Sequence, residues 1–218
     1  MYKKKPFFIV FEGIEGSGKS YLSKKLFKSL KKRRINTILT REPGGTRSAE
    51  RIRDLILKDY FNKDTKEQFD RYTDTLLYLA ARNEHIKNKI KPALCNNKVV
   101  ICDRFIDSTI AYQVFGKGVS QSLINNIHKH ILKDIRPNLT FVLRVSLNKS
   151  IHRLKKRKIK NRYDKFKKSF YLKAQRAFLS IAKNKKNYYI FDSSFDDSIL
   201  EQKIFKLIKR RIDYNGHK

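Results

Sequence analysis

The sequence is poor in cysteine, proline and acidic side chains, and it has no tryptophan. Its two cysteines are Cys95 and Cys102, and Cys102 stands within an apolar run, so a buried free thiol is favoured over a disulfide or a metal ligand. No Pro-rich tract, Gly/Ser linker or internal repeat marks a second domain. We therefore expect residues 1–218 to form one domain, which is long enough to bury a core.

Long apolar runs are also missing. The basic amino terminus, residues 1–6, is followed by an apolar stretch, residues 7–11, that runs into a glycine-rich loop and not into a small-residue cleavage site. We therefore expect neither a signal peptide nor a membrane span. Together with the free thiols, this pattern favours a reducing, cytoplasmic location.

Acidic residues are scarce, since 20 Asp and Glu stand against 52 Lys and Arg and give a formal charge of +32. Such a charge raises the hypothesis of a nucleic-acid-dependent ATPase or binding module. The basic residues, however, are spread over most of the chain without the signature of a nucleic-acid-binding module. Richness in Lys, Ile and Asn without Trp is what AT-rich coding produces, and we favour that origin. Non-specific affinity for nucleic acid at low salt is expected in either case.

The sequence does contain a complete phosphate loop. Residues 13–20 fit the pattern G-x-x-x-x-G-K-[ST] and directly follow the apolar run. A strand that breaks into such a loop and then a helix points backbone N–H groups at one anion, with Lys19 at the β and γ phosphates and Ser20 at Mg²⁺. The alternative is that the glycines merely shape a tight turn. We predict an ATP site formed by Gly13, Ile14, Glu15, Gly16, Ser17, Gly18, Lys19 and Ser20.

Short apolar runs alternate with segments of helical spacing along the whole chain. The runs predict strands over residues 7–11, 36–40, 99–102, 139–145 and 188–191. The longer segments predict helices over residues 21–32, 74–90, 120–133, 168–183 and 199–212. This alternation indicates an α/β fold with a parallel sheet between helices, and ligands at the carboxyl ends of the strands.

Two further motifs follow predicted strands. In Thr40-Arg41-Glu42-Pro43-Gly44-Gly45-Thr46 the turn leaves Arg41 at the mouth of the sheet, where a guanidinium suits a second phosphate; a solvated surface arginine is the alternative. In Asp103-Arg104-Phe105 the carboxylate stands beside the phosphate loop, where Mg²⁺ or its water is held, and Arg104 can face the acceptor phosphate. A helix N-cap is the alternative role for Asp103.

These three motifs resemble those of thymidylate kinases in order and spacing, and the resemblance extends over nearly the whole chain. The third motif continues in the same way with Ser108-Thr109-Ile110-Ala111-Tyr112-Gln113. The resemblance implies a three-layer nucleoside-monophosphate-kinase fold of the P-loop class with a five-stranded parallel sheet. It also implies a homodimer that uses Mg-ATP to phosphorylate dTMP to dTDP for dTTP biosynthesis. A kinase of the same fold with another acceptor, such as dUMP or a deoxynucleoside, stays open.

The resemblance also assigns roles to residues of the acceptor site. Glu15 contacts the sugar 3′-hydroxyl, and Arg41 and Arg104 grip the dTMP phosphate. Tyr78, where the family usually has Phe, stacks on thymine, and Arg82 donates to a base oxygen from the same helix face. From the sequence pattern alone, without the resemblance, Tyr78 would be interpreted as an aromatic side chain of the hydrophobic core. The expected dTMP-binding residues are Glu15, Arg41, Tyr78, Arg82, Arg104, Ser108, Thr109 and Gln113, and the expected metal-binding residues are Ser20 and Asp103.

Residues 151–168 align with the family's mobile lid and are strongly basic. In bacterial members of the family whose phosphate loop lacks an arginine, the lid supplies the cation for the transition state. Since this loop offers Lys19 but no arginine, the resemblance implies a lid arginine here. Arg153, Arg157 and Arg162 are candidates, and we favour the last two; a solvated basic face is the alternative for most of this segment. The expected catalytic residues are Lys19, Arg41, Arg104, Arg157 and Arg162.

Overall fold

The computed structural model describes residues 5–58, 68–156, 163, 166–194 and 197–214. Its centre is one sheet of five parallel strands in the order β2-β3-β1-β4-β5. The strands are β1 (Phe7–Glu12), β2 (Thr37–Arg41), β3 (Val99–Asp103), β4 (Leu139–Arg144) and β5 (Tyr188–Asp192). All five predicted strands and the parallel α/β class are confirmed, with bounds shifted by a residue or two.

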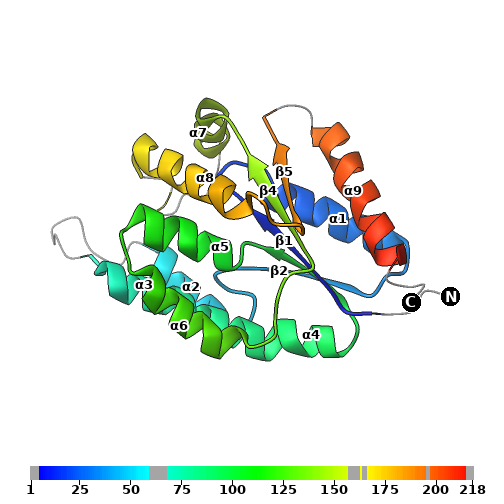
Figure 1. The fold of residues 1–218 in the computed structure, drawn as a ribbon, viewed down its shortest axis with the longest axis horizontal. Helices are drawn as coiled ribbons and strands as arrows, with labels where there is room; N and C mark the ends of the chain where they lie inside the picture. Colours follow the sequence, from blue (N-terminus) through cyan, green and yellow to red (C-terminus); the bar gives the residue numbers. More distant parts are fainter. Residues whose placement is uncertain (1–4, 59–67, 157–162, 164–165, 195–196, 215–218) are drawn as a thin grey trace.

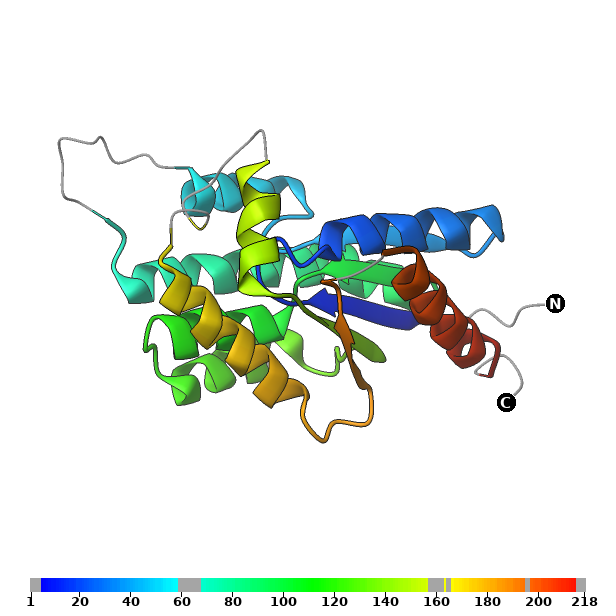
Figure 2. The same ribbon diagram turned by 90° about the horizontal axis from the view of Figure 1, so that it is seen from above.

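The sheet is covered on both faces, as its continuous apolar strands require. Alternate side chains of β1 point to opposite faces: Phe7, Ile9 and Phe11 pack against α1 (Lys19–Lys32) and α9 (Asp197–Tyr214). Phe8 and Val10 pack against the π-helical turn η1 (Ile86–Ile90) and α4 (Lys91–Cys95). Figures 1 and 2 show α1 and α9 together on one side of the sheet.

The other helices pack on one another and, through α8, on β4 and β5. They are α2 (Arg47–Leu57), α3 (Arg71–His85), α5 (Ile106–Thr109), η2 (Ile110–Gly116), α6 (Gln121–Leu132), α7 (Leu147–Lys155) and α8 (Lys168–Ala182). The predicted helices did not include α2, α4, α5, η2 and α7. Of these, α2 and α7 begin at a short hydroxyl side chain: Thr46 accepts from the Ala49 N–H at 3.2 Å, and Ser146 accepts from the Lys149 N–H at 3.4 Å.

Part of the predicted lid, residues 151–168, lies within the described residues. Residues 151–155 continue α7 and so belong to a regular helix. Of the remainder, Lys156, Tyr163 and residues 166–168 are described, and the favoured residues Arg157 and Arg162 lie outside the described part of the chain.

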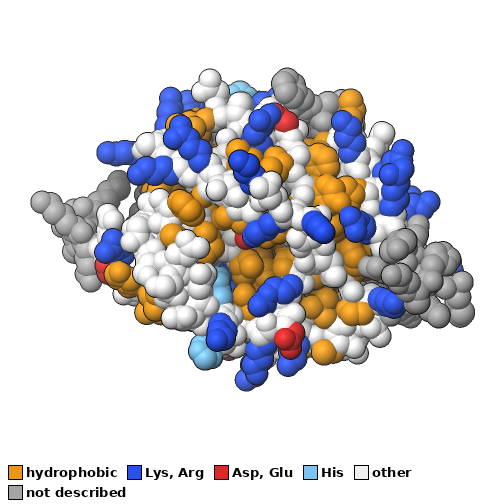
Figure 3. Space-filling model, viewed as in Figure 1, with side chains coloured by type: hydrophobic (Ala, Val, Ile, Leu, Met, Phe, Trp, Pro, Cys, Tyr) orange, Lys and Arg blue, Asp and Glu red, His pale blue; other side chains and the backbone are white. Residues whose placement is uncertain are grey.

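The surface in Figure 3 carries many Lys and Arg side chains and few acidic ones, scattered over the face shown. Cys102 is a buried free thiol, as expected, and Cys95 is exposed. Among the helices of the described residues, none has the length and apolar character needed to cross a membrane.

Candidate functional site

The loop after β1 follows a path that side chains at two of its glycines would block. Gly13 has φ +135°, and a Cβ there would stand 2.5 Å from the Leu143 carbonyl oxygen. Gly16 has φ +71°, and its Cβ would stand 2.6 Å from the carbonyl oxygen of Ser150. The loop therefore turns tightly against β4 and α7 before α1 begins, and the amide groups at the start of α1 face the same region as the loop.

Lys19 is buried and directed along the loop. Its Nζ donates to the Ile14 carbonyl oxygen at 2.7 Å and to Ser17 Oγ at 3.2 Å. Burial, and then the nearby Arg104 cation, lower the pKa of Lys19 to about 7. A bound anion beside this amine would favour its charged form.

Ser20 and Asp103 meet at the ends of α1 and β3. Ser20 Oγ donates to Asp103 Oδ2, while Asp103 Oδ1 is buried and has no hydrogen-bond partner among the described residues. The N-cap position of α5 is Phe105, so Asp103 is not the N-cap of that helix. A buried carboxylate oxygen without a donor, next to a hydroxyl, is a donor set that suits a hard cation such as Mg²⁺.

Arg104 links the end of β3 to the phosphate loop. It has φ +72°, uncommon for a residue with a side chain, and its guanidinium donates to the Gly13 carbonyl at 3.0 Å, Ser108 Oγ at 3.2 Å and Glu15 Oε1 at 2.8 Å. The Tyr112 hydroxyl donates to the other oxygen of Glu15 at 2.6 Å. Burial opposes the charge of Glu15, but Arg104, Lys19 and the Tyr112 hydroxyl together outweigh burial and hold the pKa of this carboxyl below its usual range.

Glu12, the last residue of β1, holds the segment that follows β3, and the sequence analysis missed it. Its buried carboxylate accepts from the Phe105 N–H at 2.8 Å and from the Ser108 hydroxyl at 2.7 Å. Burial, followed by the charge of Asp107, raises its pKa to about 7. The only available signal was its position directly before Gly13, at the end of a buried strand.

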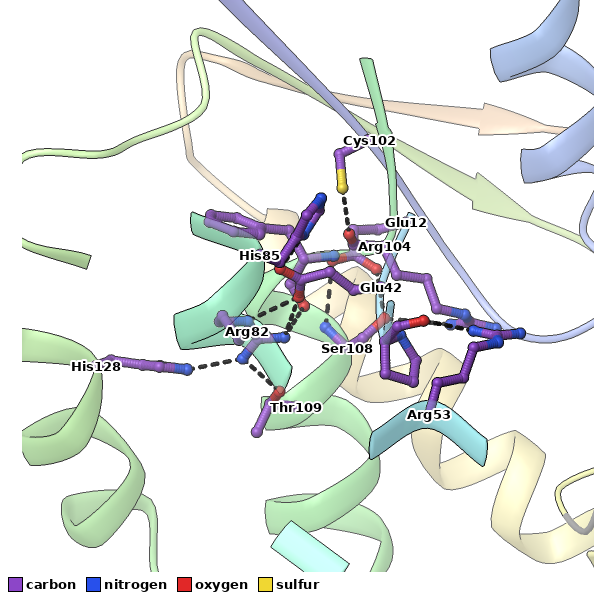
Figure 4. A network of polar contacts seen from close by, with 12 residues as sticks. Glu12, Glu42, Arg53, Arg82, His85, Cys102, Arg104, Ser108, Thr109 and His128 are labelled. Carbon is purple, nitrogen blue, oxygen red and sulfur yellow. Dashed lines mark hydrogen bonds and ion pairs between the residues drawn. The ribbon is translucent and has the colours of Figure 1, made fainter. Parts of the chain in front are cut away.

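Arg41, at the end of β2, and Arg53, on α2, line the same cavity as Arg104. Arg41 is half exposed and paired with Glu50 at 2.9 Å. Arg53, which the sequence analysis also missed, donates from Nη1 to the Pro43 carbonyl at 2.6 Å, next to a cis Glu42–Pro43 peptide. Burial, followed by the nearby Arg41 cation, lowers the pKa of Arg53. Figure 4 shows Arg53 and Arg104 directed toward each other.

Arg82 lies at the centre of a buried polar network (Figure 4). Its Nε donates to Glu42 Oε2 at 2.7 Å, and its Nη2 donates to the Phe105 carbonyl at 2.9 Å. His85 Nδ1 lies 3.1 Å from the other oxygen of Glu42, and His85 Nε2 lies 2.6 Å from Thr40 Oγ1. This network fixes the Arg82 side chain between the turn after β2 and the segment after β3.

Tyr78 is half buried on α3, and its ring meets that of Tyr163 edge-on with centroids 6.1 Å apart. The Tyr163 hydroxyl accepts from Gln113 Nε2 at 3.3 Å and donates to Asp74 Oδ2 at 3.4 Å. Burial raises the pKa of Tyr78 well above its ordinary value, so the ring is a neutral aromatic surface.

A single cavity of about 780 Å³ collects most of the predicted residues. Gly13, Ile14 and Ser17 are not among the residues that line it. The predicted residues that line it are Glu15, Gly16, Gly18, Lys19, Ser20, Arg41, Tyr78, Arg82, Asp103, Arg104, Ser108, Thr109 and Gln113. Its walls can therefore bind two phosphate groups at one end and an aromatic base at the other.

Arg153 also lines this cavity, although the prediction preferred its neighbours in the basic segment. From α7, its Nη1 donates to the Gly16 carbonyl at 3.0 Å and its Nη2 to the Ser193 carbonyl at 3.0 Å. Arg153 therefore contacts the phosphate loop, as Arg104 does at Gly13 and Glu15.

Comparisons with known proteins identify the family. Residues 11–204 match the sequence profile described as thymidylate kinase. A thymidylate kinase of Wolbachia pipientis is 44% identical over 178 residues, which cover 80% of this chain and 84% of the relative. One from Mycoplasma capricolum is 37% identical over 95% of this chain and 97% of its own. The crystal structure of thymidylate kinase from Ehrlichia chaffeensis superposes with a TM-score of 0.74 at 31% identity and covers 94% of this chain and 99% of the other.

Proposed function

The chain belongs to the thymidylate kinase family, and on that premise we propose how its own residues divide the work of the reaction. The protein is an ATP-dependent phosphotransferase that converts dTMP to dTDP. One observation carries the assignment of roles: the phosphate loop and the guanidinium groups of Arg41, Arg53 and Arg104 face a single cavity.

The donor side is formed by residues 13–20 and the first turn of α1. Backbone N–H groups of the loop bind the ATP phosphates, and the positive end of the α1 dipole adds to their field. Lys19 reaches the β and γ phosphates from its buried position, since the charge of the phosphates restores the protonated amine that burial disfavours.

Ser20 and Asp103 would hold a magnesium ion. The unpartnered Oδ1 of Asp103 and the Ser20 hydroxyl supply oxygen ligands, and phosphate oxygens and water complete such a shell. When bound there, Mg²⁺ neutralises charge on the transferred phosphoryl group.

The acceptor side binds dTMP. Arg41, Arg53 and Arg104 hold its phosphate through paired N–H donors, which match phosphate oxygens better than a lysine ammonium does. Glu15, whose two oxygens are oriented by Arg104 and Tyr112, contacts the sugar 3′-hydroxyl.

Thymine lies against the ring of Tyr78, where an offset or edge-on aromatic contact stabilises it. Ser108, Thr109 and Gln113 line the same region and supply polar groups, and Arg82 donates to a base carbonyl. Because a carbonyl oxygen accepts while an exocyclic amino group donates, this donor favours thymine or uracil over cytosine.

Transfer of the γ-phosphoryl group proceeds in line to an oxygen of dTMP that is already an anion, so no strong general base is needed. The rate enhancement comes from alignment and from the charges of Lys19, Arg41 and Arg104. From its resemblance to the family, the segment 151–168 would serve as the lid that excludes water, with a further cation from Arg153, Arg157 or Arg162. Of these three, Arg153 lies in the described part of the chain, where it contacts the loop at Gly16.

We also infer that the protein is a single domain that forms a homodimer in the cytoplasm. Tyr72 and Leu76 are 39% and 52% exposed and stand four residues apart on α3, so they form an apolar stripe that a second copy can cover. The cytoplasmic location is supported by the free thiols Cys95 and Cys102, since cysteines persist unpaired in reducing compartments.

The test is an assay of ADP release from Mg-ATP at moderate salt with dTMP, dUMP, dCMP, thymidine or single-stranded DNA as the added component. We expect strong preference for dTMP, with dTDP as the product. As a control, K19M should lose turnover and keep the thermal unfolding midpoint. Stimulation by DNA alone would instead support the nucleic-acid-dependent ATPase and overturn these assignments.

A further inference from the structure

The Nη1 group of Arg82 has two acceptors. It donates to Thr109 Oγ1 at 2.7 Å and contacts His128 Nε2 at 2.8 Å, and His128 belongs to none of the sequence motifs. Thr109 lines the cavity. His128 comes from α6 and is 6% exposed, and Figure 4 shows it reaching Arg82 from the side opposite Arg53 and Arg104.

The chemistry of this contact fixes the state of the imidazole. An arginine guanidinium can only donate, so His128 Nε2 has to be the unprotonated nitrogen that accepts. Burial, and then the charge of Arg82, lower the pKa of His128 to about 3, in agreement with a neutral ring. His128 is therefore a permanent acceptor at neutral pH.

We propose that His128 is a positioning residue for base recognition, an inference that rests on the base contact assigned above to Arg82. Nη1 carries two hydrogens. His128 accepts one of them, so the second is directed at Thr109 Oγ1, which lines the cavity. A base carbonyl oxygen beside Thr109 shares this second hydrogen with the Thr109 hydroxyl.

Loss of the His128 acceptor changes which hydrogens of Arg82 Nη1 have a partner. Without His128, one buried N–H has no partner, and the guanidinium can turn to satisfy it at the expense of its direction toward the base. Binding of dTMP then weakens, and discrimination against dCMP falls because it depends on that direction. The chemical step itself, which takes place at the phosphates, keeps its rate.

The experiment compares H128L, which has no acceptor, with H128Q, whose amide oxygen can replace Nε2, and with H130L as a control on an exposed histidine of the same helix. For H128L we expect the KM for dTMP to rise about tenfold, with kcat within about threefold and a smaller preference for dTMP over dCMP. H128Q and H130L should stay close to the wild type. If H128L does not fold, H128F provides a second variant without the acceptor.

A double-mutant cycle with R82K separates positioning from packing. Lysine at position 82 has no Nη1, so H128L should raise the KM for dTMP much less in R82K than in the wild type. Equal effects in both backgrounds, or a wild-type KM in H128L, would overturn the role of His128. A wild-type KM in R82K itself would overturn the base contact of Arg82, so the two failures are distinguishable.

Discussion

Arg104 Nη2 lies 2.8 Å from Glu15 Oε1, so the residue after β3 is paired with a residue of the phosphate loop 89 positions earlier in the chain. On the assignment proposed above, this pair joins the two phosphate sites, since Glu15 belongs to the phosphate loop and Arg104 is proposed to bind the acceptor phosphate. Both side chains are mostly buried, with 16% and 11% exposed for Arg104 and Glu15. The orientation of one therefore depends on the charge of the other.

The first prediction concerns the sugar contact of Glu15. In the wild type, kcat/KM should be higher for dTMP than for its 3′-deoxy analogue by about tenfold or more, because a hydrogen bond to a charged group is lost with the hydroxyl. In E15Q this ratio should fall toward one. A ratio that is the same in E15Q and the wild type would mean that Glu15 serves only to pair Arg104.

The second prediction concerns the backbone at Gly16. Both Gly16 and Gly118 have φ +71°, but a Cβ at Gly118 would meet only Arg71 Nη1 at 3.6 Å, whereas at Gly16 it would meet the Ser150 backbone. G118A is therefore the matched control and should lose about 1 kcal/mol of unfolding free energy. G16A should lose more and raise the KM for ATP at least about tenfold. Equal KM values for ATP in both variants would contradict the tight loop.

The residues that sequence patterns predicted well are those whose chemistry is set by local order along the chain. Lys19 follows from the loop motif and Asp103 from its place after an apolar run, and both line the cavity. The five strands were predictable because a parallel sheet buried on both faces requires continuous apolar runs.

The residues that were missed depend on contacts between distant elements. Arg53 lies on α2, where nothing in its neighbourhood distinguishes it from the exposed Arg51. Glu12 has a role only because the segment after β3 folds back onto it. His128 stands on α6, 46 residues after its partner Arg82. With many basic side chains along the chain, composition could not indicate which of them face the site.

The third prediction concerns acid stability through Glu42. Burial raises its pKa, but Arg82, followed by His85, outweighs burial and holds the pKa below 4.5. A carboxyl whose pKa is depressed by folding contributes its full stabilisation at pH values above the pKa that it has in the unfolded chain. This contribution is lost as the pH falls through the pKa that it has in the folded protein. The difference in unfolding free energy between the wild type and E42Q should thus be about 3 kcal/mol at pH 7 and shrink below pH 4.5.

Urea unfolding at several pH values between 7 and 3 measures this difference. E84Q is the control, because Glu84 accepts from Ser48 in an exposed hydrogen bond and its replacement should cost little. A difference between the wild type and E42Q that stays constant down to pH 3 would mean that Glu42 contributes by packing and not by charge.

The last prediction tests Arg53 as the third phosphate-binding guanidinium. Its Nη1 is bound to the Pro43 carbonyl at 2.6 Å, and its side chain lines the cavity near Arg41 and Arg104. R53A should raise the KM for dTMP about tenfold or more, because a charge-assisted contact to the acceptor phosphate is lost, and leave the KM for ATP unchanged. R51A, two positions earlier on α2 and exposed, should change neither value. If R53A lowers the unfolding midpoint but keeps the wild-type KM for dTMP, Arg53 supports the turn at Pro43 and does not bind the phosphate.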